Sequence, residues 1–254
     1  MFPDIGMALA AGLGARMRPL TLTTPKPLLA VGGRSMLDRV LDHFAAAGLS
    51  RAVVNAYYLK EQIAERAARR QAENHNGLEL ILSEEEAALE TGGGVFRALP
   101  HLGDRPFFTA NADIIWRDGP GGPALRRLAL AWDDGAMDAL LLLARRDGAF
   151  GYDGPGDFFC ESDGAPLMRR GTAAAAPYVF AGVQIIRPQA FDGFSDGAFS
   201  LNRVWDRLAP NGRLRGLVHD GGWWHVGDPA ALEQADAQLR QIEVEAGEGE
   251  DGGR

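Results

Sequence analysis

The sequence predicts an α/β fold, because apolar segments alternate with amphipathic ones along most of the chain, as in βαβ architecture. A chain of 254 residues, 46% of them hydrophobic, can bury a sizeable core and suits one large α/β domain or two small ones. Its apolar runs are all shorter than the roughly eighteen residues of a transmembrane helix. We therefore expect an α/β protein that does not insert into a membrane.

The alternation is most regular before Arg145. Strands are predicted over Ile5–Ala10, Ala52–Tyr57, Leu78–Leu82, Pro106–Ala110 and Met137–Ala144. Helices are predicted between them, over Ser35–Ala47, Lys60–Gln71, Gly94–Leu99 and Pro123–Trp132. The first of these helices has the clearest ends, since Ser35 is a suitable N-cap and Gly48 follows the last turn.

After Arg145 the pattern becomes irregular. Loops are predicted in the segments rich in glycine, proline or alanine, Asp147–Gly156 and Thr172–Pro177. Short strands at Asp157–Cys160 and Tyr178–Ile186 indicate a small antiparallel extension, and helices are predicted at Leu201–Leu208 and Pro229–Ile242. We expect a single domain over residues 1–243, followed by a disordered acidic tail at 244–254, which has nothing to bury.

The net charge of −8 is unevenly distributed. About half of it lies after Ile242, where five acids accompany one arginine. The segment from Gly12 to Arg34 contains no acid and has four basic residues: Arg16, Arg18, Lys26 and Arg34. The acidic total argues against nucleic acid as a partner. A single cysteine, Cys160, and an N-terminus unlike a signal peptide predict a protein of the reducing cytoplasm.

The strongest motif follows the first predicted strand. It reads L-A-A-G-L-G-A-R-M-R-P-L-T over Leu9–Thr21 and continues as P-K-P-L over Pro25–Leu28. Spaced glycines after a buried strand let backbone N–H groups turn toward an anion. Arg16 and Lys26 could then neutralise phosphate charge, although a tight turn with solvated basic residues would give a similar pattern. The motif matches neither a P-loop nor a dinucleotide-binding fingerprint.

Taken together, these two blocks resemble the signature of the sugar-1-phosphate nucleotidyltransferases. The resemblance implies a Rossmann-like, three-layer α/β/α fold of the GT-A-like type with a mixed central sheet; no six-residue repeat predicts a β-helix domain here. It also implies transfer of a nucleotidyl group from a nucleoside triphosphate to a sugar 1-phosphate, with release of pyrophosphate. Residues 1–145 would form the nucleotide-binding half and 146–243 the sugar-binding half. The nucleotide ligands it implies in this block are Ala10, Ala11, Gly12, Gly14, Arg16 and Lys26.

The predicted strand before Asp113 ends in N-A-D, Asn111–Asp113. Ligands of open α/β sheets bind at the carboxyl ends of strands, so Asp113 is well placed to bind Mg²⁺, although a capping or solvent-facing aspartate would look the same. The family resemblance favours the metal site. It also implies that Asn111 lies near the sugar.

The segment Leu89–Gly94, L-E-T-G-G-G, precedes a predicted helix. Three consecutive glycines permit flat contact with a nucleobase, or simply make a flexible loop. The string resembles the N-acetylmuramate 1-phosphate uridylyltransferases of peptidoglycan recycling in the cell wall. That likeness implies UTP as donor and base contacts from Glu90, Thr91, Gly92 and Gly93.

Two segments depart from the family pattern. Where the family has a second metal-binding aspartate in W-x-D-x-G-T-P, this chain has W-W-H-V-G-D-P, Trp223–Pro229, with His225 at the aspartate position and Asp228 at the threonine position. Imidazole is a poor Mg²⁺ ligand, so either Asp228 supplies the second carboxylate from a shifted position or Asp113 alone suffices with the nucleotide phosphates. His225 is a further candidate, as a metal ligand or as a hydrogen-bond donor to a phosphate.

The second departure concerns the sugar. The family's glycine contact aligns with Gly156, and its acidic contact aligns with the pair Arg169 and Arg170. Arginine would suit a sugar that bears a carboxylate, as N-acetylmuramate does, but a solvated pair on a strand edge is also possible. Gly182 corresponds to a family glycine that borders the sugar.

The sequence thus predicts a Mg²⁺-dependent nucleotidyltransferase acting on an NTP and a sugar 1-phosphate, as a monomer or small homo-oligomer. Catalysis would use Arg16, Lys26 and Asp113. The alternatives are a guanylyltransferase for mannose 1-phosphate or another hexose 1-phosphate, and a non-catalytic regulatory subunit that binds a nucleotide sugar.

Overall fold

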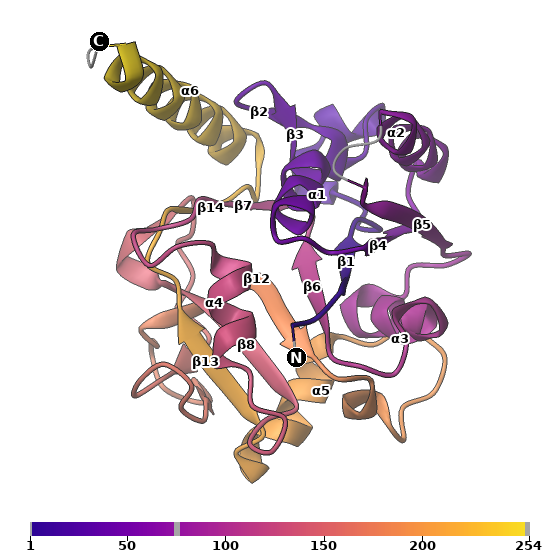
Figure 1. Ribbon diagram of the computed structural model, residues 1–254, viewed down its shortest axis with the longest axis vertical. Helices are drawn as coiled ribbons and strands as arrows, with labels where there is room; N and C mark the ends of the chain where they lie inside the picture. The colour runs from indigo at the N-terminus through magenta and orange to yellow at the C-terminus, as the bar shows by residue number, and fades with distance from the viewer. Residues whose placement is uncertain (1, 74–76, 252–254) are drawn as a thin grey trace.

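A mixed nine-stranded sheet runs through the molecule (Figure 1). The computed structural model describes residues 2–73 and 77–251, from 243 onward by backbone alone. Along the sheet the order is β11-β10-β12-β6-β1-β4-β5, while β8 pairs with β12 and with β13. These strands are β1 (Ile5–Leu9), β4 (Arg51–Ala56), β5 (Glu79–Glu84), β6 (Phe107–Asn111), β8 (Ala139–Arg145), β10 (Phe158–Phe159), β11 (Met168–Arg169), β12 (Tyr178–Ile186) and β13 (Leu214–Val218).

The parallel part of the sheet consists of β6, β1, β4 and β5. Their register places Leu9 of β1 beside Asn111 of β6, and the backbone N–H of Ala112 donates to the carbonyl of Leu9 at 3.0 Å. All four strands therefore end at the same edge of the sheet. Polar residues that follow these strands are brought together there, although they are far apart in sequence.

The remaining strands come from the second half of the chain and make the sheet mixed. Strand β12 is antiparallel to both β6 and β8, and β10 and β11 form an antiparallel extension beside it. One sheet therefore spans both halves of the chain. The predicted antiparallel extension is confirmed.

Helices cover both faces of this sheet. Apolar residues of α1 (Met36–Ala46), α2 (Lys60–Ala72) and α4 (Ala124–Ala131) pack in one core, and those of α3 (Glu90–Leu102) and α5 (Leu201–Leu208) pack in another. Neighbouring strand residues alternate between these cores, as Phe107 and Phe108 do. The three-layer α/β/α architecture is thereby confirmed.

A third cluster of apolar residues lies outside the sheet. It joins Met17 to Trp224 and Val226 and to Ala235 and Leu239 of α6 (Pro229–Asp251). Trp224 belongs to β14 (Trp223–His225), which pairs with β7 (Ile114–Trp116) and β9 (Ala149–Phe150). The sequence did not predict these short strands. It also did not predict the hairpin formed by β2 (Ala30–Val31) and β3 (Arg34–Ser35).

Two expectations about helices need correction. Helix α3 begins at Glu90 rather than at Gly94, so the glycine triplet forms its first turns. Helix α6 continues to Asp251, through most of the segment expected to be disordered; residues 252–254 lie outside the described residues. That expectation considered only burial, whereas a helix backbone satisfies its own hydrogen bonds and glutamate and alanine favour it.

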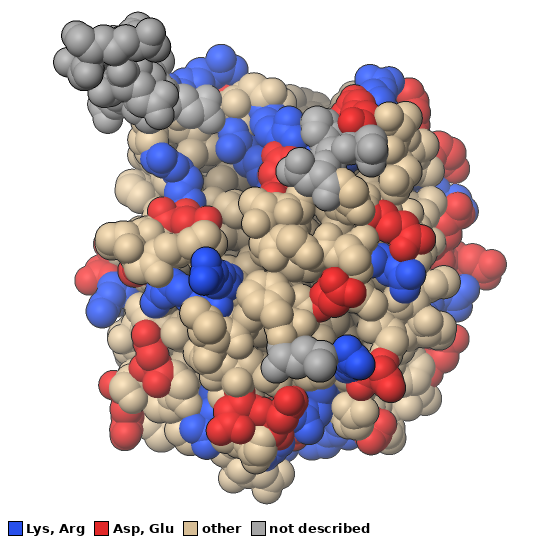
Figure 2. Space-filling model, in the orientation of Figure 1, with Lys and Arg blue, Asp and Glu red and all other residues tan. Residues whose placement is uncertain are grey.

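The charges are more evenly balanced than the sequence suggests. Acidic and basic side chains are interspersed over the face seen in Figure 2. Two of the four basic residues between Gly12 and Arg34 have carboxylate partners, since Arg34 pairs with Asp42 and Lys26 pairs with Asp113. Within residues 2–73 and 77–251, the helices are too short or too polar to cross a membrane.

Buried ion pairs hold α1 against α2. Arg70, which is 2% exposed, contacts Asp38 at 3.3 Å and Asp42 at 2.8 Å. Burial would raise the pKa of Asp38, but hydrogen bonds from Arg66 and Ser35 outweigh it and the pKa is lowered. Asp38 therefore contributes stability above a pH of about 4, and this contribution is lost as the pH falls through the lowered pKa.

We expect Arg70→Ala to lower the free energy of unfolding by about 2 kcal/mol, because it removes a buried guanidinium that two carboxylates share. Each carboxylate keeps one other arginine partner, so the loss stays below that of an unpaired buried charge. Arg69→Ala is the matched control: its side chain is 63% exposed and, among the described residues, pairs with Glu65 alone, one helical turn away, so a loss below about 0.5 kcal/mol is expected. Urea denaturation of both variants measures the difference. Equal losses would show that the buried pairs do not hold the helices together.

Candidate active site

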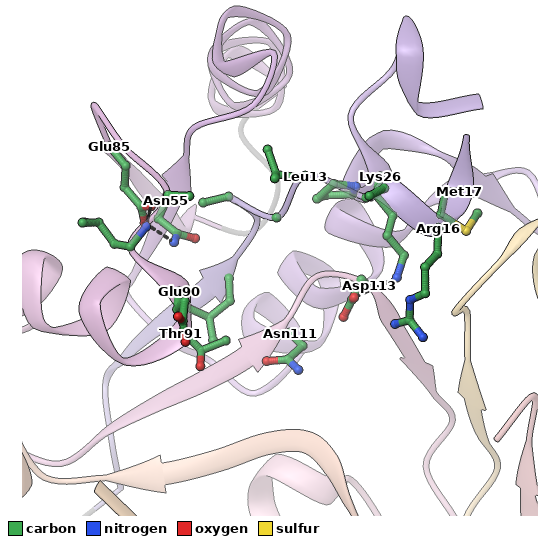
Figure 3. A pocket seen from close by; sticks show the side chains of 18 of the residues that line it. Leu13, Arg16, Met17, Lys26, Asn55, Glu85, Glu90, Thr91, Asn111 and Asp113 are labelled. Atoms are coloured by element: carbon green, nitrogen blue, oxygen red, sulfur yellow. Dashed lines mark hydrogen bonds and ion pairs between the residues drawn. The ribbon is translucent and has the colours of Figure 1, made fainter. Parts of the chain in front are cut away.

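A cavity of about 420 Å³ opens at the carboxyl edge of the parallel strands (Figure 3). It extends from the glycine turn after β1 to the start of α3, and it also reaches the end of β6. The lining residues used below are Ala11, Gly12, Gly14, Arg16, Lys26, Asn55, Glu85, Leu89, Glu90, Thr91, Asn111, Asp113 and Gly227. The catalytic and phosphate-binding residues predicted from the sequence therefore surround one space.

The glycine turn has the features needed to bind an anion closely. Gly14 has a φ of +58°, and a Cβ there would lie 2.9 Å from the Thr21 side chain and 3.0 Å from Cβ of Lys26. Thr21 fixes the turn by donating its hydroxyl hydrogen to the carbonyl of Gly14 at 2.8 Å. A Cβ on Gly12 would meet no atom within 4 Å, so the backbone there is open to a ligand.

Arg16 lies in the short 3₁₀ turn Ala15–Met17 that follows the glycines. Its side chain is exposed and borders the cavity, whereas the neighbouring Met17 is buried in the cluster with α6 and β14. Arg16 has no ion-pair partner among the described residues. The anchored methionine thus holds a free guanidinium at the mouth of the cavity.

Lys26 and Asp113 form an ion pair beside Arg16, at the same end of the cavity (Figure 3). Nζ of Lys26 lies 2.8 Å from Oδ2 of Asp113; the lysine is 6% exposed, whereas the aspartate side chain is 39% exposed. A buried ammonium requires such a partner. The second carboxylate oxygen, Oδ1, has no hydrogen-bond partner among the described residues.

A second cavity, of about 360 Å³, adjoins the first and shares Thr91, Asn111 and Asp113 with it. Its wall combines polar and aromatic side chains, as expected for a small polar ligand. The sequence did not single out most of these residues, which come from loops, α5 and β14 in the second half of the chain: Tyr152, Asp157, Ser200, Asn202, Trp205 and Trp223.

His225 lies in the wall of the second cavity, where β14 pairs it with Ile114 of β7, the residue after Asp113. Burial lowers the pKa of His225, and nearby Lys26 and Arg16 lower it further against the opposing effect of Asp113. The ring is therefore neutral at pH 7 and suited to hydrogen bonding. Asp228 instead caps α6, where its Oδ1 accepts from the backbone N–H of Ala231 at 2.9 Å.

The glycine triplet is packed inside the protein and does not face the cavity. The backbone N–H groups of Gly92 and Gly93 both donate to the carbonyl of Phe199, at 2.8 and 3.0 Å. A Cβ on Gly92 would lie 2.5 Å from the Phe199 ring, and one on Gly93 would lie 2.2 Å from the carbonyl of Gly197. Of the L-E-T-G-G-G segment, Leu89, Glu90 and Thr91 line the cavity and the three glycines do not.

The residues expected to bind the sugar are only partly brought together. Asn111 lines both cavities, and a Cβ on Gly182 would lie 3.3 Å from the Asn111 side chain. Arg170 is used by the loop beside it, donating to the carbonyls of Gly156 and Ala173 at 3.0 and 2.8 Å. Neither Gly156 nor Arg170 lines the second cavity.

Arg169 borders the second cavity from outside. It donates to Oδ1 of Asn202 at 2.9 Å and lies 3.0 Å from Asp206, with its guanidinium over the rings of Phe158 and Trp205. Asn202 and Trp205 belong to the cavity wall. The pair treated as equivalent in the sequence thus divides into a loop-stabilising Arg170 and a cavity-bordering Arg169.

Comparisons with known proteins agree with this geometry. The family model described as the MobA-like NTP transferase domain matches residues 6–152. The N-acetylmuramate alpha-1-phosphate uridylyltransferase of Caulobacter vibrioides is 42% identical over 94% of this chain and 98% of its own length. Its namesake from Neisseria meningitidis serogroup B is 34% identical over 91% and 96%.

Solved structures share the fold at low sequence identity. UDP-glucose pyrophosphorylase complexed with UDP-glucose superimposes with a TM-score of 0.77 at 13% identity, covering 95% of this chain and 100% of that one. The inositol-1-phosphate CTP transferase of T. maritima gives 0.71 at 18% identity, covering 93% and 96%. With a family model over more than half of its length and a relative matched almost end to end, the chain belongs to the sugar-1-phosphate nucleotidyltransferases, within the MobA-like NTP transferase family.

Proposed function

We propose that this enzyme transfers a uridylyl group from UTP to N-acetylmuramate 1-phosphate, giving the UDP-sugar and pyrophosphate. The observation that carries the proposal is the position of Asp113, which lines both cavities, pairs with Lys26 and lies near Arg16 (Figure 3). The names of two relatives matched over more than nine-tenths of the chain support the choice of substrates.

The reaction would be an in-line attack, in which an oxygen of the sugar phosphate bonds to the α-phosphorus of UTP and the bond to pyrophosphate breaks. The glycine turn would hold the triphosphate by backbone N–H groups, and Arg16 would stabilise the departing pyrophosphate. Lys26 would exchange its bond to Asp113 for a phosphate oxygen at the reacting centre. Neutral His225, in the wall of the second cavity, would donate a hydrogen bond to the sugar phosphate. Catalysis would thus consist of positioning and charge neutralisation.

The donor set fits Mg²⁺ in a nucleotide complex. The described residues form no cluster of three or more histidine, cysteine, aspartate or glutamate side chains that would hold a metal unaided. Mg²⁺ commonly uses one or two carboxylates with substrate phosphates, and Oδ1 of Asp113 is available for this purpose. When bound, the ion would neutralise phosphate charge.

A panel of four NTPs and several sugar 1-phosphates tests the function directly. We expect Mg²⁺-dependent pyrophosphate release with UTP and N-acetylmuramate 1-phosphate, abolished by EDTA. Release only with GTP and mannose 1-phosphate would contradict the substrate assignment. No release with any pair would leave a nucleotide-sugar-binding role.

We expect Arg16→Ala to lower kcat by roughly 10²–10³-fold, since it removes a cation from the developing pyrophosphate. Arg18→Ala is the matched control, because Arg18 is also exposed in the same turn but does not line the cavity. Steady-state kinetics and thermal melting of both variants provide the comparison. Equal kcat values in the two variants would remove Arg16 from the mechanism.

We expect Arg169→Ala to raise KM for N-acetylmuramate 1-phosphate roughly tenfold, because its guanidinium, held against the wall residue Asn202, would pair with the lactyl carboxylate. N-acetylglucosamine 1-phosphate lacks that carboxylate and serves as the control substrate. Its KM should be unchanged. A parallel rise for both sugars would assign Arg169 to the packing of the cavity wall instead.

A further inference from the structure

A tyrosine outside the cavity is hydrogen-bonded to the segment that shapes the glycine turn. Tyr58 lies between β4 and α2, far from the turn in sequence. Its hydroxyl group donates to the backbone carbonyl of Thr21 at 2.7 Å. Thr21 is 1% exposed and in turn donates its own hydroxyl hydrogen to the carbonyl of Gly14 at 2.8 Å. Tyr58 is thus connected to the turn through one buried residue, and the proposed mechanism uses neither.

The bond from Thr21 determines the direction of one peptide group in the turn. The peptide between Gly14 and Ala15 is trans, so its C=O and its N–H point in opposite directions. Because the C=O of Gly14 points toward Thr21, the N–H of Ala15 points away from it. Ala15 lines the cavity, and its N–H has no acceptor in the part of the chain that the structure describes. This N–H is therefore available to an anion.

A second hydrogen bond joins the same segment to α2. Nε2 of Gln62, in the first turn of that helix, donates to the carbonyl of Thr23 at 2.9 Å. Thr21 and Thr23 both lie between the glycine turn and Lys26, the two phosphate-binding parts of the motif. The start of α2 and the tyrosine before it therefore hold the chain that connects these two parts.

The residue between Tyr58 and α2 has a strained backbone. Leu59 has a φ of +48° and a ψ of +43°, in the left-handed region that β- and γ-branched residues rarely adopt. Such a conformation persists only where surrounding contacts hold it. The hydrogen bonds of Tyr58 and Gln62, on either side of Leu59, supply such contacts. The chain thus bears a local cost at the position that directs both side chains to the segment after the glycine turn.

We propose that Tyr58 is a positioning residue for the triphosphate. Through Thr21 it keeps the glycine turn, before any ligand binds, in the shape that presents backbone N–H groups to phosphate oxygens. Donors that are fixed in advance bind an anion without the cost of ordering them. Tyr58 does not line the cavity, so it acts through this connection alone. The inference rests on the proposed binding of the donor triphosphate at the turn and adds the residue that shapes this site from outside.

Titration calorimetry with inorganic tripolyphosphate and Mg²⁺ tests the inference without a base or a sugar. Tyr58→Phe removes the hydroxyl group and keeps the ring, so we expect roughly fivefold weaker binding, as for the loss of one hydrogen bond. In steady-state kinetics KM for UTP should rise by a similar factor, whereas KM for the sugar 1-phosphate should not change. A lower melting temperature with unchanged tripolyphosphate affinity would assign Tyr58 to stability alone and overturn the inference.

Tyr57→Phe is the matched control. Tyr57 is the adjacent tyrosine and is also partly buried, but its hydroxyl group has no hydrogen-bond partner among the described residues and it does not line the cavity. This variant should keep the wild-type affinity. An equal loss in both variants, or no binding of tripolyphosphate by the wild-type protein, would overturn the inference. Binding that depends on Tyr58 without pyrophosphate release from any sugar 1-phosphate would instead overturn the proposed function and leave Tyr58 as a residue that shapes an anion site.

Thr21→Val tests the connection itself, because valine has nearly the shape of threonine and lacks the hydroxyl group. It should weaken tripolyphosphate binding at least as much as Tyr58→Phe does. Since both changes act on the same turn, the double variant should bind within about twofold of Thr21→Val alone. Losses that multiply would show that Tyr58 acts by another route and would overturn the inference. Thr21→Ser retains the hydroxyl group and should bind as the wild-type protein does; a loss equal to that of Thr21→Val would assign the effect to packing and would also overturn the inference.

Discussion

The parallel pairing of β6, β1, β4 and β5 is the constraint on which the site depends. Parallel strands end at a common edge, so each contributes the first residues of its following loop to the same place. The glycine turn follows β1, Asp113 follows β6, and Asn55 and Glu85 lie at the ends of β4 and β5. A slip of one residue between β1 and β6 would move Asp113 away from Lys26. The site is in this sense a property of the sheet register.

The same arrangement explains how an acidic protein keeps a cationic site stable without its ligand. Lys26 is buried and is held by Asp113, while Arg16 remains exposed to water. Neither group therefore carries the cost of an unpaired buried charge. A triphosphate entering this space would compete with Asp113 for the ammonium of Lys26. In the free protein Lys26 is thus balanced by a carboxylate and Arg16 is hydrated, and a bound triphosphate would contact both.

Sequence reasoning identified those parts of the site that depend on local pattern. Lys26 and Asp113 were predicted from short motifs beside predicted strands, and they form a direct ion pair. The role of Gly92 could not be predicted, because it depends on Phe199, which lies far away in sequence. No sequence motif marked Asn55 as a residue of the site either, since it is a single polar residue within an apolar strand. The role of such a position depends on contacts with residues that are far away in the sequence. A single sequence does not show which of those residues will be in contact.

The packing of Met17 against α6 has a consequence for how the protein is made. The glycine turn lies among the first residues to leave the ribosome, but Trp224, Val226 and Leu239, which pack against Met17 beside it, are synthesised more than two hundred residues later. The early sheet can assemble as it emerges, since its strands and helices are close in sequence. The apolar support of the turn cannot be completed at that stage. A chain that ended before α6 would therefore lack one side of the packing that holds Met17.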